Sequence, residues 1–285
     1  MDQYESAAEL IAEADALLIN AGAGMGVDSG LPDYRGNEGF WKAYPHLGNA
    51  RLTFAEVATP QVLERDPALG WGFYGHRLAL YRSTVPHEGF QILQKWAKQA
   101  PYGGRVFTSN VDGQFQKAGF SEDVIHECHG SLHHLQCTTG CNAGIWSADS
   151  FLPEVNESEC RLLNDPPTCP HCGALARPNV LMFDDFRWRP DRSEAQERNE
   201  RMWLNQLSRA RARTVIIELG AGTSIPSVRH FSNYVSHACN GRIVRINLRE
   251  SAVPHPYDVG IAGGALACVR AIDSVLTGEP HDQGI

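Results

Sequence analysis

The sequence has no excess of positive charge and no long hydrophobic run. Its 25 Lys and Arg residues are outnumbered by 33 Asp and Glu residues, which gives a formal net charge of −8. A surface that follows phosphate groups usually needs clustered basic side chains, so this balance argues against general binding to nucleic acid or acidic membranes. No segment reaches the ~20 consecutive apolar residues that a membrane-spanning helix needs.

The first twenty residues also lack the features of an export signal. They begin acidic and contain no basic region, no long apolar core and no small-residue cleavage site. No internal repeat or low-complexity tract interrupts the chain, and its 42% hydrophobic and 20% charged residues fit one sizeable domain with a satellite, or two small domains. We therefore expect a soluble cytoplasmic protein without a membrane or nucleic-acid partner.

Disulfide bonds are not expected, although the chain has eight cysteines. Four of them form two close pairs with Cys-x3-Cys and Cys-x2-Cys spacing, and in a reducing compartment such pairs indicate a metal site. Four thiolates leave no open coordination position, which is typical of structural rather than catalytic zinc. Cys160 lies between the pairs and is an alternative ligand, whereas His171 is expected to be an exposed spacer. The predicted zinc ligands are Cys137, Cys141, Cys169 and Cys172.

The order of apolar runs predicts an α/β fold. Continuous apolar runs that suit strands buried on both faces occur at residues 16–20, 104–110, 123–130, 213–222 and 241–248. Helical patterns lie before and between them, at residues 7–14, 89–99, 194–212, 227–238 and 264–276. This alternation predicts a doubly wound, Rossmann-like parallel sheet whose ligand site lies at the carboxyl ends of the strands.

Two segments interrupt the alternation. Residues 37–86 are aromatic-rich and expected to be helical, and residues 137–172 contain the paired cysteines. We interpret both as insertions that form a smaller zinc-binding and helical domain. The Rossmann-like, nucleotide-binding domain would then comprise residues 1–36, 87–136 and 173–285.

A glycine-rich loop follows the first predicted strand, in the stretch "NAGAGMGVDSGLPDYRG" at residues 20–36. Gly22, Gly24 and Gly26 permit close backbone approach, so that amide N–H groups can face a pyrophosphate. Taken alone, the glycines are equally compatible with a tight strand-to-helix connection that binds nothing. The nucleotide site is favoured by the whole phrase, in which the glycines are followed at fixed offsets by Asp28, Ser29, Pro32, Asp33 and Arg35.

Several phrases, in a fixed order, resemble the motifs of one known family. "GAGMGVDSGLPDYRG" is similar to an NAD-binding signature, "TSNVDG" (108–113) to a second NAD motif and "HGSL" (129–132) to a catalytic-histidine motif. "CPHCGALARPNVLMF" (169–183) resembles a second zinc pair followed by a substrate-binding strand, and "GAGTS" and "RINL" resemble adenosine-side motifs. The family is the sirtuins, NAD-dependent protein-lysine deacylases, and the resemblance extends roughly from residue 7 to residue 276.

The resemblance implies NAD-dependent removal of acyl groups from protein lysine, with nicotinamide and O-acyl-ADP-ribose as products and zinc as a structural ion. His129 is the implied general base, and Asn110 and Asp112 position the nicotinamide ribose and the leaving group. An acyl-lysine protein or peptide is the implied partner and would contact Val180 and Phe183. The remaining implied contacts of NAD are Gly22, Ala23, Gly24, Asp33, Tyr34, Arg35, Ser109, Gly222, Thr223, Ser224 and Asn247.

Each of these assignments has a plainer alternative. His129 is one of 12 histidines, and "TSNVDG" is also an Asx-rich turn that can simply end a strand. The position of His129 in "HGSL", directly after a predicted strand, favours its role as a base. His126, His133 and His134 have no such motif, and we expect them to be structural.

The chain departs from the family pattern at two places. Ser109 stands where the family usually has Gln, which shortens a side chain near the reacting ribose and puts the catalytic rate in question. Asp184 and Asp185 follow Phe183 where the family has Phe-Gly-Glu, so the contacts with the acyl-lysine backbone are expected to differ here.

One further pair concerns the acyl group. In "WGFYGHRLALYR" (71–82), Tyr74 and Arg77 lie three residues apart and are predicted neighbours on one helix face. This Tyr-x-x-Arg pair matches the one with which malonyl- and succinyl-preferring sirtuins bind the distal carboxylate through a phenol and a guanidinium. The alternative is a packed aromatic beside a solvated arginine.

The same pocket is compatible with two other functions. An ADP-ribosyltransferase would cleave the same bond of NAD and transfer ADP-ribose to protein or water. A non-catalytic sensor would bind NAD or ADP-ribose without reaction, and the presence of His129 argues against it.

Overall fold

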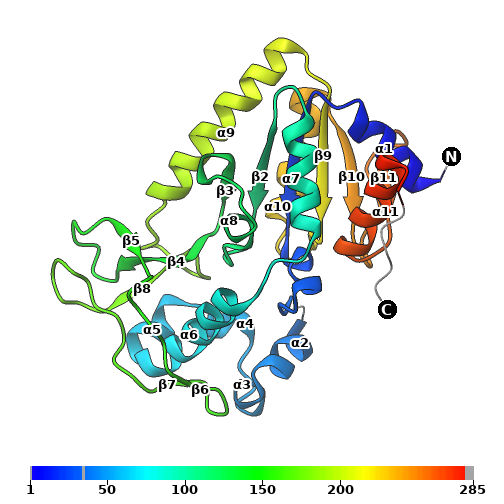
Figure 1. The fold of residues 1–285 in the computed structure, drawn as a ribbon. Helices are drawn as coiled ribbons and strands as arrows, with labels where there is room; N and C mark the ends of the chain where they lie inside the picture. The colour runs from blue at the N-terminus through cyan, green and yellow to red at the C-terminus, as the bar shows by residue number, and fades with distance from the viewer. Residues whose placement is uncertain (1, 34–35, 280–285) are drawn as a thin grey trace.

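A six-stranded parallel sheet forms the centre of the computed structural model, which describes residues 2–33 and 36–279 (Figure 1). The strand order is β11-β10-β9-β1-β2-β3, and every neighbouring pair is parallel. The strands are β1 (Ala16–Ala21), β2 (Gly104–Thr108), β3 (Ile125–Glu127), β9 (Thr214–Leu219), β10 (Arg242–Ile246) and β11 (Val259–Ile261). The order reverses direction at β1, as in a doubly wound fold, which confirms the predicted fold class.

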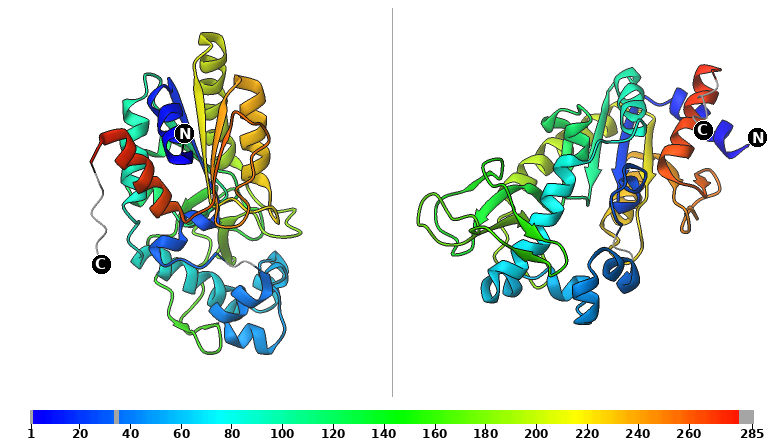
Figure 2. Two further views of the ribbon diagram at one scale, coloured as in Figure 1. Left: turned by 90° about the vertical axis from the view of Figure 1, so that its right-hand side faces the viewer. Right: turned by 60° about the horizontal axis from the view of Figure 1, so that its bottom comes forward.

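Helices cover both faces of this sheet, as the edge-on view in Figure 2 shows. Leu17 and Ile19 of β1 pack in one hydrophobic cluster and Leu18 in another, because successive side chains of a strand point to opposite faces. All six residues of β1 are buried, which explains its continuous apolar sequence. The helices of the first face are α1 (Gln3–Ala12), α7 (Gly89–Gln99) and α11 (Ala265–Thr277), and those of the second are α9 (Asp191–Ala210) and α10 (Ser227–Cys239).

A smaller module has a hydrophobic core of its own, which includes Phe40, Trp71, Phe73 and Leu132. Its helices are α2 (Gly36–Ala43), α3 (Pro45–Asn49), α4 (Phe54–Val57), α5 (Pro60–Arg65) and α6 (Pro67–Ser83). A three-stranded sheet in the order β5-β4-β8 and a small hairpin of β6 and β7 accompany them. The strands are β4 (Gly130–Cys137), β5 (Ile145–Ser147), β6 (Val155–Asn156), β7 (Arg161–Leu162) and β8 (Ala176–Val180).

The turn between the two sheets depends on Gly130. Its φ is +79°, and a Cβ at this position would lie 2.0 Å from the carbonyl oxygen of Asn179. Only glycine combines this conformation with so close an approach, so the chain ends β3 at Glu127 and starts β4 in a different sheet. The predicted domain boundaries place residues 130–136 and 176–180 with the nucleotide-binding domain, whereas β4 and β8 pair with each other outside the parallel sheet. We retain the two-domain division as a proposal.

Among the described residues, no helix combines the length and apolar composition needed to cross a bilayer. The short helix α8 (Gln114–Lys117) follows the loop after β2 and completes the approach to the candidate site.

Candidate active site

A cavity of about 830 Å³ lies between the loops at the carboxyl ends of β1, β2 and β9 and the smaller module. This is the place where open parallel sheets bind ligands, because the loops of neighbouring strands diverge there. The predicted site residues that line the cavity are Gly22, Ala23, Asp33, Tyr74, Arg77, Ser109, Asn110, Asp112, His129, Val180, Phe183, Gly222, Thr223 and Ser224.

Four predicted NAD contacts are not among the lining residues. Tyr34 and Arg35 lie outside the described residues. The amide of Gly24 donates to the carbonyl oxygen of Gly220 over 3.1 Å, so Gly24 packs between the loops after β1 and β9. Asn247 is buried behind the cavity wall, where its Nδ2 donates to the carbonyl oxygen of Ala221 over 2.8 Å.

The His129 ring lines the cavity and has partners that orient it. Its Nε2 lies 3.0 Å from Oγ of Ser227, the first residue of α10. Burial lowers the pKa of His129, and an interaction with the backbone of Ser109 offsets part of this effect. A lowered pKa keeps the imidazole neutral near pH 7, the form that can accept a proton. Because Ser109 acts here through its backbone, this contact does not depend on the residue's identity.

Asn110 and Asp112 are held by the loops around them. Nδ2 of Asn110 donates to the carbonyl oxygen of Gly22 over 3.0 Å, which links the loops after β1 and β2. Asp112 is 8% exposed, and its Oδ1 accepts the amide of Gln114 over 2.9 Å. Burial raises the pKa of Asp112 to about 6, although the nearby charge of Arg77 acts in the opposite direction. Asp112 is therefore a carboxylate at neutral pH in a poorly solvated place.

Tyr74 and Arg77 of α6 project into the same cavity as His129. Both are buried, with 1% and 7% of their surface exposed. Burial raises the pKa of Tyr74 to about 12, so the phenol keeps its proton and remains a hydrogen-bond donor. Sequence reasoning missed Tyr81, which lines the cavity and accepts hydrogen bonds from Arg77. Its spacing of four residues after Arg77 was the available signal.

The segment after β8 forms another wall of the cavity and is fixed at both ends. The amide of Leu181 donates to the carbonyl oxygen of His129 over 2.9 Å, and that of Phe183 donates to Ala58 over 3.0 Å. Leu181 and Met182 line the cavity beside the predicted Val180 and Phe183.

The two aspartates that depart from the family pattern have distinct places. Asp184 has a φ of +52°, a conformation that glycine adopts more easily than aspartate. The side chain of Asp185 is fully buried, and both its oxygens accept hydrogen bonds from the guanidinium of Arg177. Oδ1 of Asp185 also accepts the amide of Arg187 over 3.1 Å, and Oδ2 that of Met182 over 3.3 Å. Asp185 therefore stabilises the cavity segment from behind.

The loops that the sequence predicts to contact adenosine contribute a polar end to the cavity. Oγ1 of Thr223 donates to Oε1 of Glu250 over 2.6 Å, and Arg249 and Glu250 also line this end. Oδ1 of Asn247 accepts the amides of both residues over 3.1 Å, so Asn247 shapes the loop that carries them. Sequence reasoning missed Arg249 and Glu250 because they follow the end of the "RINL" phrase.

The other histidines close to the motif lie outside the cavity lining. Nδ1 of His126 is 2.7 Å from Glu200 of α9, and its Nε2 is 3.3 Å from Oγ of Ser193. All three side chains are buried, so this Ser-His-Glu arrangement has no access for a substrate and attaches α9 to β3. Nε2 of His133 bonds the carbonyl oxygen of Asp112 over 2.9 Å.

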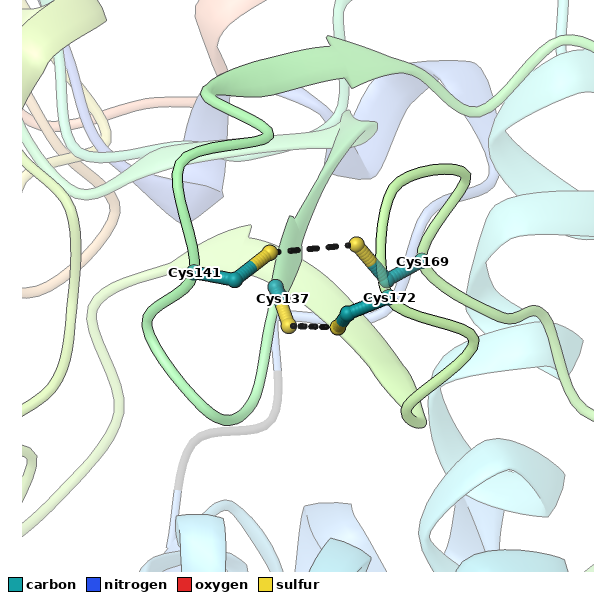
Figure 3. Close-up of side chains that lie close together, drawn as sticks. All are labelled: Cys137, Cys141, Cys169 and Cys172. Atoms are coloured by element: carbon teal, nitrogen blue, oxygen red, sulfur yellow. Dashed lines mark hydrogen bonds between the residues drawn. The ribbon is translucent and has the colours of Figure 1, made fainter.

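The four paired cysteines converge in the smaller module (Figure 3). Their Sγ atoms all lie within 4.8 Å of one another, with Cys137 and Cys172 3.6 Å apart and Cys141 and Cys169 3.4 Å apart. Four thiolates on a tetrahedral zinc ion, with Zn–S distances of about 2.3 Å, have S–S separations of about 3.8 Å. The donor set and spacing therefore fit a closed structural zinc site. Cys160 is not part of this cluster, and its carbonyl packs against Gly72 of α6.

Comparisons with known proteins agree with this geometry. The family model described as "Sir2 family" matches residues 22–199. An NAD-dependent protein deacylase of Pyrococcus furiosus is 29% identical over 258 residues, which cover 90% of this chain and 91% of the relative. The NAD-dependent protein deacylase 2 of Pyrobaculum aerophilum is 30% identical over 258 residues, covering 90% of each protein.

Solved structures resemble the whole chain as well. A Sir2 homologue in complex with NAD has a TM-score of 0.70 and 26% identity, with 98% of this chain and 95% of that chain covered. A Sir2 homologue in complex with ADP-ribose has a TM-score of 0.69 and 25% identity, with 98% of each chain covered. The chain belongs to the Sir2 family, which confirms the resemblance to sirtuins.

Proposed function

We propose that this member of the Sir2 family is an NAD-dependent protein-lysine deacylase that prefers malonyl- and succinyl-lysine. The relatives are named as deacylases, and solved relatives at 25% and 26% identity are complexes with ADP-ribose and NAD. The observation that carries the acyl preference is the placement of a buried arginine and a buried phenol, Arg77 and Tyr74, in the cavity that His129 also lines.

The residues around the cavity fit NAD in chemical type. Backbone at Gly22 and Ala23 and at the loop 222–224 would face the phosphates and adenosine, because short side chains there allow close backbone approach. Asn110 and Asp112 would hold the nicotinamide end. When bound, NAD would supply an electrophilic ribose carbon that accepts the acyl oxygen, with nicotinamide as the leaving group.

His129 acts as the general base in this proposal. Its neutral ring would accept a proton from a hydroxyl of the ribose, while Ser227 keeps the ring oriented. The carboxylate of Asp112 would supply negative charge to stabilise the positive charge that develops when nicotinamide leaves.

The acyl-lysine enters along the segment formed by Val180 and Phe183. A terminal carboxylate in this buried region loses water, and that loss is costly unless charge-assisted hydrogen bonds replace it. Arg77 supplies the charge and Tyr74 a second donor. An acetyl group has no carboxylate for either residue to bind.

Product analysis tests the proposal. The protein is incubated with NAD and otherwise identical peptides that carry acetyl-, malonyl- or succinyl-lysine, and the products are identified by mass spectrometry. We expect O-acyl-ADP-ribose, formed faster from the two acidic groups. Free ADP-ribose or ADP-ribosylated protein without deacylation would identify an ADP-ribosyltransferase, and absence of any product a sensor. Faster turnover of acetyl-lysine would contradict the acyl preference alone.

Arg77→Met tests the acyl preference more directly, since methionine keeps much of the stem and removes the charge. We expect a fall in kcat/KM for succinyl-lysine that corresponds to a loss of ~2–4 kcal/mol in transition-state stabilisation. The loss for acetyl-lysine should be much smaller. Equal losses for both groups would show that Arg77 and Tyr74 are ordinary helix packing.

A further inference from the structure

The guanidinium of Arg77 is bound by a residue one turn further along α6. Nε of Arg77 donates to Oη of Tyr81 over 3.0 Å, and Nη2 donates to the same oxygen over 2.8 Å. We propose that Tyr81 is a positioning residue that orients Arg77 toward the acyl group and thereby sets the selectivity for acidic acyl chains. The inference rests on the function proposed above.

Tyr81 is itself firmly placed. Its side chain is 5% exposed, and its carbonyl oxygen accepts Nε2 of Gln114 over 3.2 Å. Gln114 is 1% exposed, and its amide donates to Oδ1 of Asp112 over 2.9 Å. The side chain of Tyr81 is therefore held by packing and its backbone by Gln114 at the start of α8, which places the phenol oxygen as an acceptor for Arg77.

The two hydrogen bonds select one edge of the guanidinium. Arginine can bind a carboxylate in a bidentate manner through its Nε–Nη2 edge or through its Nη1–Nη2 edge. Because Tyr81 occupies the first edge, a carboxylate that binds Arg77 together with Tyr81 is restricted to the second. Aromatic rings pack around the same group, with the guanidinium carbon 5.2 Å from the ring centre of Phe73 and 5.9 Å from that of Phe54.

The chemistry of the partner distinguishes Arg77 from the other deeply buried arginine of the module. Arg177 is bound on two nitrogens by the carboxylate of Asp185, which neutralises its charge. The phenol of Tyr81 accepts two hydrogen bonds from Arg77 without cancelling its charge. Tyr81 can therefore fix the direction of the guanidinium without neutralising it.

Tyr81→Phe tests this inference because it keeps the ring and removes only the oxygen. Kinetics are measured with NAD and with peptides that carry succinyl- or acetyl-lysine. We expect kcat/KM for succinyl-lysine to fall roughly 10-fold, mainly through KM, as for loss of hydrogen bonds to a charged group. The succinyl-to-acetyl ratio should fall with it, and KM for NAD should stay within about twofold. An unchanged ratio would overturn the proposal.

A matched variant separates positioning from general loosening of the module. Tyr44→Phe also removes a buried phenol oxygen, one that lies 2.8 Å from Nδ1 of His76, and Tyr44 does not line the cavity. We expect this variant to retain the wild-type succinyl-to-acetyl ratio. If Tyr44→Phe lowers the ratio as much as Tyr81→Phe does, the role of Tyr81 is structural and the proposal is wrong.

A double variant separates this inference from the acyl preference itself. If Tyr81 acts through Arg77, Tyr81→Phe should cause no further loss in succinyl turnover when combined with Arg77→Met. An additional 10-fold loss in that background would contradict the inference. If Arg77→Met alone leaves the succinyl-to-acetyl ratio unchanged, the proposed acyl preference and the inference about Tyr81 both fail. Loss of the ratio in Arg77→Met but not in Tyr81→Phe would overturn the role of Tyr81 only.

Discussion

Gly24 and Gly220 are packed backbone against backbone. A Cβ on Gly24 would lie 2.7 Å from Cα of Gly220, and a Cβ on Gly220 would lie 2.4 Å from Cα of Gly24. Gly220 also has a φ of +59°, which favours glycine. The loops after β1 and β9 can therefore meet only without side chains at these positions, and their contact shapes one wall of the cavity.

Gly24→Ala should push these two loops apart. We expect a loss of ~1–3 kcal/mol in the free energy of unfolding, which is typical of overpacking, and a higher KM for NAD. Chemical denaturation and initial-rate kinetics measure the two effects. Gly264→Ala is the matched control, because a Cβ there would lie 3.5 Å from the nearest atom, an ordinary contact. Equal stability of the two variants would contradict this account of the loops.

Substitution of His129 should separate binding from chemistry. His129→Ala is expected to lower kcat by ~10²–10⁴-fold, the range for loss of a general base, while NAD binding measured by calorimetry is largely retained. Because burial lowers the pKa of His129, the wild-type rate should decline on the acidic side only below the ordinary range of histidine. Unchanged turnover in the variant would rule out the assignment.

Asp112 should make the protein less stable as the pH rises. Burial raises its pKa to about 6, so between about pH 4 and pH 6 the folded protein retains a proton that the unfolded chain has lost. The favourable contribution of the protonated form is present at the acidic end of this range and is lost as the pH passes 6. Asp112→Asn should remove the cost of burying an ionised carboxylate above this pH.

We therefore expect Asp112→Asn to be more stable than the wild type at pH 8, by up to ~3 kcal/mol, and nearly equal to it near pH 4. Urea unfolding of the ligand-free proteins at both pH values measures the difference. The same variant should be a poorer enzyme, because the carboxylate is lost from the end of the cavity that we propose to bind nicotinamide. If the stability difference between variant and wild type is the same at both pH values, titration of Asp112 is not its cause.

Removal of zinc should unfold the smaller module. Binding free energy at a closed thiolate site is also folding free energy, so a chelator or Cys169→Ser should expose the hydrophobic core around Trp71. Tryptophan fluorescence, circular dichroism and metal analysis measure the effect. Protein purified without chelator should contain about one zinc per chain. Less than about half a zinc per chain, or disulfides between the paired cysteines, would contradict a structural zinc site.

Much of the fold follows from the sequence because the central strands are buried on both faces. The five predicted apolar runs correspond to β1, β2, β3, β9 and β10, and the helix predicted at 89–99 coincides with α7. Strand β11 was not predicted, because three residues with a central glycine carry no periodic pattern. Strands β4 and β5 were also missed, since the register of β4 against β8 shifts between Ser131 and Leu135 and the alternation of side chains is broken there. Strand β8 lies within the phrase that the resemblance identifies as a substrate-binding strand.

The candidate site was predictable where a short phrase of sequence carries the chemistry. The paired cysteines are a compact signal, and the structure brings all four together. Contacts between distant segments have no such signal: the pairing of Tyr81 with Gln114 joins residues 33 positions apart, and the packing of Gly24 on Gly220 joins two different loops. The role of Asp185 was equally hidden, because a carboxylate in a loop indicates exposure until its buried arginine partner is seen.

The hydrogen bond from the Leu181 amide to the His129 carbonyl oxygen has a practical consequence for mutagenesis. The segment that we propose to face the peptide is attached to the backbone of residue 129, whereas the proposed proton transfer belongs to its ring. Any side chain introduced at this position leaves the carbonyl in place, so a variant that has lost catalysis should still dock its acyl-lysine peptide. Such a variant can be used, in the presence of NAD, to isolate natural substrates.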